Sequence, residues 1–216
     1  MAEPVAPGRF ITLEGGEGAG KSTQARRLAS WLGACGIDCL LTREPGGSPG
    51  AEDIRTLLVT GEPGRWDAVT EALLMNAARR DHVVRTIRPA LAAGKWVICD
   101  RFLDSTLAYQ GYAGGVPLAT LRSLIDAAVE GTRPDLTLVL DLRPETGLAR
   151  AHGGGLGTET RFERKGLAFH AAVRDGFRAI VADEPGRCAV VDAGGSADEV
   201  AAGIVETVSR RLGVEA

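Results

Sequence analysis

Cysteine is scarce in this 216-residue chain, and its spacing excludes the common metal sites. The four cysteines are Cys35, Cys39, Cys99 and Cys188. Cys35 and Cys39 could be mistaken for one half of a zinc site, but no second pair follows to complete it. We therefore expect reduced thiols, as in a cytoplasmic protein.

Long apolar runs and an excess of positive charge are also missing. No segment is long enough to cross a bilayer, so no membrane association is expected. The first ten residues, MAEPVAPGRF, lack the basic and then apolar layout of a signal peptide. The 25 lysines and arginines are balanced by 28 aspartates and glutamates, and the net charge of −3 argues against nucleic acid as a partner.

The chain's length and its 44% hydrophobic residues suit one domain, residues 1–216, with a substantial core. Short apolar runs with little alternation are typical of strands buried on both faces of a parallel sheet, and five occur: RFITL, IDCLLT, KWVICD, DLTLVLD and RCAVVDA. Helical patterns lie between them, at about 20–33, 51–59, 67–92, 117–130, 144–152, 161–183 and 196–212. This order predicts an α/β fold, a doubly wound three-layer α/β/α sandwich with a five-stranded parallel sheet.

The stretch FITLEGGEGAGKSTQARRLASWL joins the first strand to the first helix through a phosphate-binding loop. Gly15, Gly20, Lys21 and Ser22 fit the pattern G-x-x-x-x-G-K-[ST], in which backbone N–H groups cradle phosphates and lysine reaches the β- and γ-phosphates. A chance match is disfavoured because a strand precedes the loop and a helix follows it. The predicted ATP-binding residues are Gly15, Gly16, Glu17, Gly18, Ala19, Gly20, Lys21, Ser22 and Thr23. The loop therefore predicts a P-loop fold that binds a nucleoside triphosphate, and it does not say what receives the phosphate.

A second polar group, in VICDRFLDSTLAYQG, comes where the third strand should end. Asp100 can hold Mg²⁺ together with the Ser22 hydroxyl, and Arg101 can grip a phosphate with two parallel hydrogen bonds. The simpler interpretation is a surface ion pair that caps the next helix. The nearby phosphate loop favours the ligand-binding one.

The long helix at 67–92 contains LLMNAARRDHV. Met75 and Arg79 are four residues apart and share a face, with His82 close to it. A separate apolar stripe, expected to face the core, consists of Leu73, Ala77, Val84, Ile87 and Leu91. Arg79 is offset from this stripe and can point into a cleft, although a solvated arginine has the same spacing. A lone histidine such as His82 is more often packed or capping than a ligand.

These pieces, in this order, resemble the thymidylate kinase family. The matching motifs run through nearly the whole chain: LEGGEGAGKST, TREPGG, AARRDHV, DRFLDSTLAYQG, RPDLTLVLDLRPETGLAR and RFE. The resemblance implies transfer of the γ-phosphate of ATP to thymidine 5′-monophosphate (dTMP), with Mg²⁺ as cofactor. It also implies a homodimer, which suits a 67–92 helix that is apolar over more than one face.

The resemblance places the acceptor-phosphate and sugar contacts. Arg101 is expected to hold the acceptor phosphate, supported by Arg43. Glu44 and Pro45 shape that side of the pocket. Glu17, inside the phosphate loop, is expected to accept a hydrogen bond from the sugar 3′-hydroxyl.

The base contacts follow from the same resemblance. Arg79 is expected to donate to the thymine O4. Ser105 and Gln110 lie near the hydrogen-bonding edge of the base. Tyr109 lies against the sugar and leaves no space for a 2′-hydroxyl.

The chain departs from the family in two places. Met75 stands where a phenylalanine usually stacks on the thymine, and a thioether packs there less rigidly. The predicted mobile lid at about 150–160 is rich in glycine and has lost most of its basic charge. Arg150 and Arg161 remain as candidates to join Lys21 and Arg101 in catalysis, with Arg150 favoured.

Two alternatives remain open. The first is another nucleoside monophosphate kinase, which AARRDHV, Glu17 and Tyr109 argue against. The second is a P-loop switch or partition-type ATPase. Such a protein needs a water-positioning residue and switch loops, and neither is found in the sequence.

Overall fold

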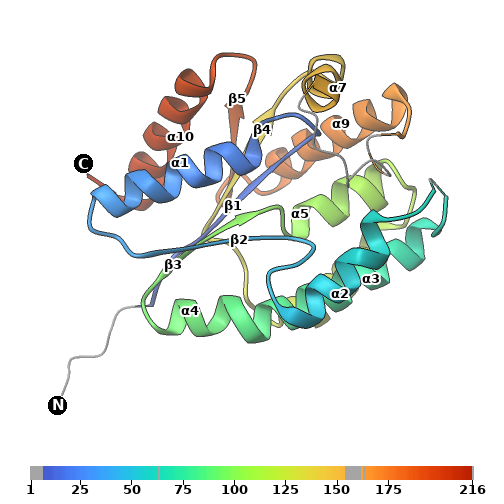
Figure 1. Ribbon diagram of the computed structural model, residues 1–216, viewed down its shortest axis with the longest axis horizontal. Coiled ribbons are helices and arrows are strands. Elements are labelled where there is room, and N and C mark those ends of the chain that lie inside the picture. Colours follow the sequence, from blue (N-terminus) through green and yellow to red (C-terminus); the bar gives the residue numbers. More distant parts are fainter. Residues whose placement is uncertain (1–6, 63, 154–161, 163, 216) are drawn as a thin grey trace.

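The computed structural model describes residues 7–62, 64–153, 162 and 164–215 (Figure 1). Five parallel strands form its sheet in the order β2-β3-β1-β4-β5. Their bounds are β1 Phe10–Gly15, β2 Cys39–Arg43, β3 Trp96–Asp100, β4 Leu136–Asp141 and β5 Cys188–Asp192. The five strands and their parallel pairing confirm the predicted α/β fold. The strand order reverses direction at β1, so a crevice opens beyond its carboxyl end.

Helices cover both faces of the sheet (Figure 1). Helices α1 (Lys21–Ala34) and α10 (Ala197–Leu212) pack together on one face. The other face is covered by α3 (Ala68–His82), η1 (Val83–Ile87), η2 (Leu107–Tyr112), α6 (Leu118–Val129) and α9 (Leu167–Asp183). The remaining helices are α2 (Pro49–Val59), α4 (Arg88–Ala92), α5 (Leu103–Thr106) and α7 (Pro144–Gly153).

The central strands contribute to two separate cores. Phe10 and Val97 pack into the core under α3, α6 and α9. The next residues along the same strands, Ile11 and Ile98, pack into the core under α1 and α10. Successive side chains of a strand point to opposite faces, so a strand buried on both faces needs apolar residues at consecutive positions. This is the reason that the apolar runs show little alternation.

The structure corrects two predicted helices. No helix was predicted at residues 103–112, because this run contains Asp, Ser, Thr and Gly, which are poor helix formers. In the structure these residues form α5 and η2. The predicted helix 67–92 is continuous but contains a wider π-helical turn, η1, between α3 and α4. Of the predicted helix 161–183, the part Leu167–Asp183 forms α9. Within the described ranges, no helix is long and apolar enough to span a membrane.

The predicted apolar stripe of the 67–92 helix is only partly right. Ile87 is buried and Leu91 packs against the core, but the three earlier members do not face it. Leu73 is 50% exposed and Val84 is 43% exposed, and Ala77 is exposed between them. Arg79, in contrast, is 2% exposed and is among the largest fully buried side chains. Periodicity identified two faces of this helix but could not tell that the polar one faces inward. Arg80, the next residue of the helix, forms an ion pair with Glu130.

Candidate active site

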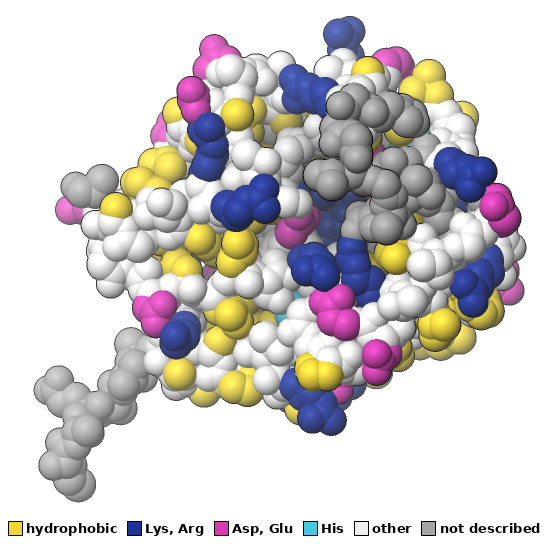
Figure 2. Space-filling view, viewed as in Figure 1, with side chains coloured by type: hydrophobic (Ala, Val, Ile, Leu, Met, Phe, Trp, Pro, Cys, Tyr) yellow, Lys and Arg dark blue, Asp and Glu magenta, His cyan; other side chains and the backbone are white. Residues whose placement is uncertain are grey.

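A cavity of about 290 Å³ opens beyond the carboxyl ends of β1, β2 and β3. Its wall brings together most of the predicted site residues: Glu17, Gly18, Gly20, Lys21, Ser22, Thr23, Arg43, Glu44, Pro45, Met75, Arg79, Asp100, Arg101, Ser105, Tyr109 and Gln110. Gly15, Gly16 and Ala19 belong to the same loop without lining the cavity. Lysine and arginine side chains gather near the centre of the face shown in Figure 2.

The phosphate loop has the backbone that its glycines predict. Gly20 has a φ of 84° and is the N-cap of α1. Gly18 has a φ of 66°, and a Cβ there would lie 2.0 Å from the Gly147 carbonyl oxygen. The Lys21 ammonium donates to the Gly16 carbonyl at 2.7 Å. Burial lowers the pKa of Lys21 to about 8, helped by Arg101. A buried cation at a helix N-terminus is suited to receive phosphate charge.

Ser22 and Asp100 are in contact, as expected for a shared cation site. Ser22 Oγ donates to Asp100 Oδ2 at 2.5 Å. Their hydroxyl and carboxylate oxygens are the hard ligands that Mg²⁺ prefers, and Mg²⁺ usually takes its remaining ligands from water and substrate phosphates. No cluster of three or more His, Cys, Asp or Glu that could hold a metal occurs in the part of the chain that the structure describes. The residues present therefore fit a cation shared with a nucleotide.

Arg101 is held by four acceptors at the centre of the cavity. Its Nη2 donates to Glu17 Oε1 at 2.9 Å and to the Tyr109 hydroxyl at 3.1 Å. Its Nη1 donates to the Gly15 carbonyl at 3.0 Å and to Ser105 Oγ at 3.2 Å. The backbone of Arg101 has a φ of 69°, a left-handed conformation that costs a residue with a side chain about 1–3 kcal/mol. Such local strain points to a functional position.

Glu17 is explained by an ion pair that the sequence did not reveal. Burial raises the pKa of Glu17, but Arg101 and Lys21 outweigh it and lower the pKa to about 2. Tyr109 also donates its hydroxyl to Glu17 Oε1, at 2.8 Å. The charge of the Glu17 carboxylate is therefore balanced by Arg101 and is not that of a solvated loop residue. The carboxylate also orients the Arg101 guanidinium and the Tyr109 hydroxyl. Its predicted contact with a sugar hydroxyl stays a prediction.

Glu14 is a buried residue of the site that sequence reasoning missed. It lies on β1 and is 0% exposed. Its Oε1 accepts from the backbone N–H groups of Phe102 and Ser105, and Oε2 accepts from Ser105 Oγ at 2.5 Å. Burial raises the pKa of Glu14 to about 7, with a further contribution from Asp104. Glu14 thus caps the start of α5 and fixes the turn that carries Arg101.

Arg79 lies at the other end of the cavity in a nearly saturated set of hydrogen bonds. Its Nε donates to Glu44 Oε2 at 2.8 Å, and its Nη1 donates to Asn76 Oδ1 at 2.9 Å. Its Nη2 donates to the Phe102 carbonyl at 3.0 Å and to Thr106 Oγ1 at 3.1 Å. An Arg guanidinium has five N–H groups, so one Nη1 hydrogen is left for a ligand.

The wall near Arg79 contains one predicted amide and one unpredicted aromatic ring. Gln110 Nε2 donates to Glu71 Oε2 at 3.1 Å, and both side chains are buried. Met75 also lines the cavity and is half-buried, and its predicted contact with the base stays a prediction. Phe162 also lines the cavity and meets the Tyr109 ring edge-on, with centroids 6.0 Å apart. The sequence indicated a place for Phe162 in the cavity only through its aromatic side chain within the RFE motif.

Two arginines lie where the acceptor phosphate was predicted. Arg43 lines the cavity, and its Nη2 bonds to both carboxylate oxygens of Glu52 at 3.1 Å. Arg55 on α2 was not predicted, but it lines the same wall and donates to the Pro45 carbonyl at 2.6 Å. Burial lowers the pKa of Arg55, and the charge of Arg43 adds to this effect. Neighbouring like charges of this kind favour an anion between them.

Arg150, the favoured lid arginine, does not line the cavity. Its Nη1 donates to the Ala193 carbonyl at 3.0 Å and its Nη2 to the Gly194 carbonyl at 3.2 Å. It therefore contacts the turn between β5 and α10. Arg161 and the lid segment 154–160 lie outside the described residues, so their predicted roles stay predictions.

Asp141, at the end of β4, pairs with two arginines of α9. Its carboxylate accepts from Arg174 at 2.7 and 2.9 Å and from Arg178 at 2.8 Å. The hydrogen bonds from Arg174 hold the pKa of Asp141 below its usual range. Asp141 thus fastens the end of β4 to the helix that follows the lid segment.

Known proteins share this arrangement over nearly the whole chain. The thymidylate kinase family model matches residues 13–204. The thymidylate kinase of Caulobacter vibrioides is 56% identical over 207 residues, which cover 96% of this chain and 99% of the relative. The thymidylate kinase of Rhizorhabdus wittichii is 53% identical over 206 residues, covering 95% and 99%.

A solved structure agrees with these sequences. The crystal structure of thymidylate kinase from Ehrlichia chaffeensis superimposes with a TM-score of 0.75 at 35% identity, covering 94% of this chain and 99% of that one. Both the sequence matches and the fold therefore lead to the same family. The chain belongs to the thymidylate kinase family.

Proposed function

We propose that the protein transfers the γ-phosphate of ATP to dTMP, giving the diphosphate, with Mg²⁺ as cofactor. The observation that carries this proposal is one continuous cavity with two chemically different ends. Lys21 and Ser22 of the phosphate loop lie at one end, and Arg79 and Gln110 lie at the other. Membership of the thymidylate kinase family supports the choice of acceptor.

The donor end works through charge and position. The loop amides and Lys21 bind the donor phosphates, and α1 adds its N-terminal dipole. Ser22 and Asp100 hold Mg²⁺, which supplies positive charge to the donor phosphates when bound. In phosphoryl transfer the protein takes little part in covalent chemistry. Most of the rate acceleration therefore comes from holding the two substrates in line.

The acceptor end holds the monophosphate and its base. Arg101 binds the acceptor phosphate, and Arg43 and Arg55 line the same cavity. Arg101 is poised for this role because Glu17 and Tyr109 already fix its guanidinium plane. Phosphate oxygens would replace some of these acceptors, and charge-assisted bonds to phosphate are the stronger ones.

The base pocket discriminates through hydrogen bonds that are already set. The free Nη1 hydrogen of Arg79 donates to the thymine O4, and Gln110 contacts the edge of the base. Tyr109 packs against the sugar, and Met75 packs on the face of the base. A pocket built around fixed polar groups rejects an acceptor that leaves them unpaired.

The family also supports an assembly and a location. We propose a homodimer through the exposed apolar stripe on α3 and η1. Val69 is 49% exposed and Leu73 50% exposed, and Ala77 and Val84 continue the stripe. Exposed apolar patches of this kind mark protein interfaces. A single domain spanning residues 1–216 and a cytoplasmic location complete the proposal.

The test is ADP formation from ATP and Mg²⁺ with one acceptor at a time. The acceptors are dTMP and the monophosphates of deoxyuridine, deoxycytidine, adenosine and guanosine. We expect turnover to be fastest with dTMP. Faster turnover with another acceptor would keep the phosphate chemistry and refute the assigned base pocket.

A further inference from the structure

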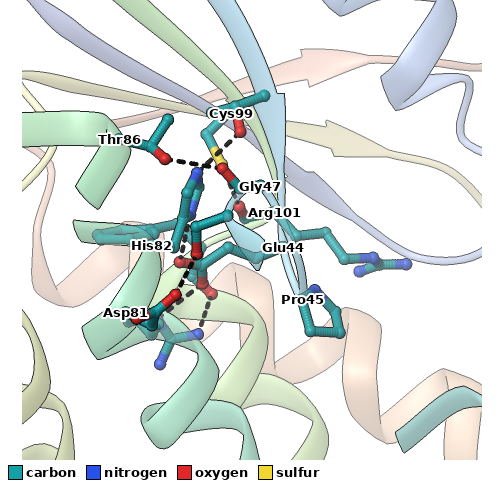
Figure 3. Close-up of polar contacts among 12 residues, drawn as sticks. Glu44, Pro45, Gly47, Asp81, His82, Thr86, Cys99 and Arg101 are labelled. Carbon is teal, nitrogen blue, oxygen red and sulfur yellow. Dashed lines mark hydrogen bonds and ion pairs between the residues drawn. The ribbon is translucent and has the colours of Figure 1, made fainter. Parts of the chain in front are cut away.

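His82 lies beneath the base end of the cavity without touching it. It is the last residue of α3 and is 0% exposed, as expected of a packed histidine. Its Nδ1 lies 3.1 Å from Glu44 Oε1, and its Nε2 lies 2.8 Å from Thr42 Oγ1. Figure 3 shows His82 and Glu44 facing one another, where α3 meets the end of β2.

For a neutral imidazole, the carboxylate partner sets the direction of both hydrogen bonds. A proton on Nδ1 donates to the Glu44 carboxylate, and Nε2 then accepts from the Thr42 hydroxyl. The other neutral form would place the Nδ1 lone pair against carboxylate lone pairs, which repel it. One carboxylate oxygen of Glu44 is thereby held by His82, and the other is held by Arg79 Nε.

The position of the imidazole is fixed independently by the turn after β2. A Cβ added at Gly47 would lie 2.3 Å from His82 Nε2 and 2.5 Å from Thr42 Oγ1, so only glycine leaves space for the ring. Thr86 Oγ1 donates to the Gly47 carbonyl at 2.8 Å and holds the same turn from η1. The ring therefore has one position, and it transmits that position to Glu44.

We infer that His82 is a positioning residue for acceptor-base selection, acting through Glu44 on Arg79. The inference rests on the proposed function, because it assigns a task to the arginine that contacts the base. Glu44 has two oxygens and two partners. If the His82 partner is lost, the carboxylate rotates to bind more of the guanidinium. The single Nη1 hydrogen left for a ligand then loses its direction.

A purely structural role for His82 makes a different prediction. A buried ring that only fills space affects stability and affects all acceptors equally. A ring that orients Arg79 changes the discrimination between thymine and cytosine. Those bases differ at the position that Arg79 contacts, because thymine has an acceptor there and cytosine a donor.

The experiment compares variants of the full-length enzyme with dTMP and dCMP as acceptors. His82→Leu keeps an apolar side chain and removes both hydrogen bonds. His82→Asn keeps an N–H donor close to the position of Nδ1. Thr42→Val is isosteric and releases only Nε2. Thr86→Val is the matched control, because it loosens the same turn without contacting Glu44 or His82.

We expect His82→Leu to lower the ratio of kcat/KM for dTMP over dCMP about tenfold, as is typical of one hydrogen bond to a charged group. KM for dTMP should rise, while kcat and KM for ATP stay within about twofold. His82→Asn should retain most of the selectivity. Thr42→Val should shift the ratio in the same direction but less, and it serves as the readout if His82→Leu does not fold. Thr86→Val should leave the ratio unchanged.

The outcomes separate this inference from the proposed function. If the wild-type enzyme prefers dTMP and all four variants keep that preference, His82 only packs and the inference is wrong. If Thr86→Val lowers the ratio as much as Thr42→Val, the turn and not the imidazole sets the selectivity, which also overturns it. A wild-type enzyme with no preference among acceptors contradicts the proposed function itself, and the assignment of His82 with it.

Discussion

Replacing Glu44 tests whether the base end of the site depends on a buried charge pair. The Glu44 and Arg79 side chains are 4% and 2% exposed, and they meet at 2.8 Å. Glu44→Gln keeps the shape of the side chain but leaves the guanidinium charge uncompensated inside the protein. Removing one partner of a buried ion pair costs about 3–5 kcal/mol. In a domain of this size, 1 kcal/mol lowers Tm by about 2–4 °C, so the expected loss is roughly 6–20 °C.

The assay is thermal unfolding of the wild type and two variants. Glu52→Gln is the control because it breaks the Arg43 pair, whose side chains are 53% and 42% exposed. An exposed pair of this kind contributes about 1 kcal/mol at most. A Glu44→Gln loss no larger than that of Glu52→Gln would refute the reasoning. The double variant Glu44→Gln with Arg79→Met should recover part of the loss, since no unpaired charge remains.

Three further predictions concern other parts of the cavity. Glu14 has a pKa raised to about 7, so its contribution to stability is present below about pH 4.5 and is lost as pH rises through 7. The free energy of unfolding of Glu14→Gln, relative to that of the wild type, should therefore rise by about 2–3 kcal/mol from pH 5 to pH 8. Urea unfolding at both pH values measures it. A difference between variant and wild type that does not change with pH would contradict the burial argument. Met75→Phe should lower KM for dTMP, and an unchanged KM would mean that the base packs elsewhere. Arg150→Ala should raise KM for ATP, because Arg150 holds the carbonyls after β5; a fall in kcat alone would instead support its predicted catalytic role.

The parts of the site predicted from sequence are those that local chemistry specifies. The phosphate loop is one run of residues, and its glycines, lysine and serine act on one ligand. Asp100 and Ser22 were paired because parallel strands end at the same edge of a sheet, which places the end of β3 beside the loop after β1. The alternation of strands and helices determined the layers in the same way.

Sequence reasoning missed contacts between residues that lie far apart along the chain and whose residue types form many kinds of contact. Glu17 and Arg101 are paired across 84 positions, and Glu14 caps a helix 88 positions away. No sequence pattern around either residue of a pair indicates its partner. Arg79 was placed off the core because its position is offset from the apolar stripe. Its burial depends on hydrogen bonds to Glu44, Asn76 and Thr106, which helical periodicity does not indicate.

The most direct test of the account follows the γ-phosphate itself. ATP labelled at the γ-position is incubated with the enzyme, Mg²⁺ and dTMP, and the labelled products are separated. The account predicts label in thymidine diphosphate, at a rate that Lys21→Ala and Arg101→Ala abolish. Label that appears only as inorganic phosphate, at a rate indifferent to dTMP, would show a nucleotide hydrolase and contradict the account.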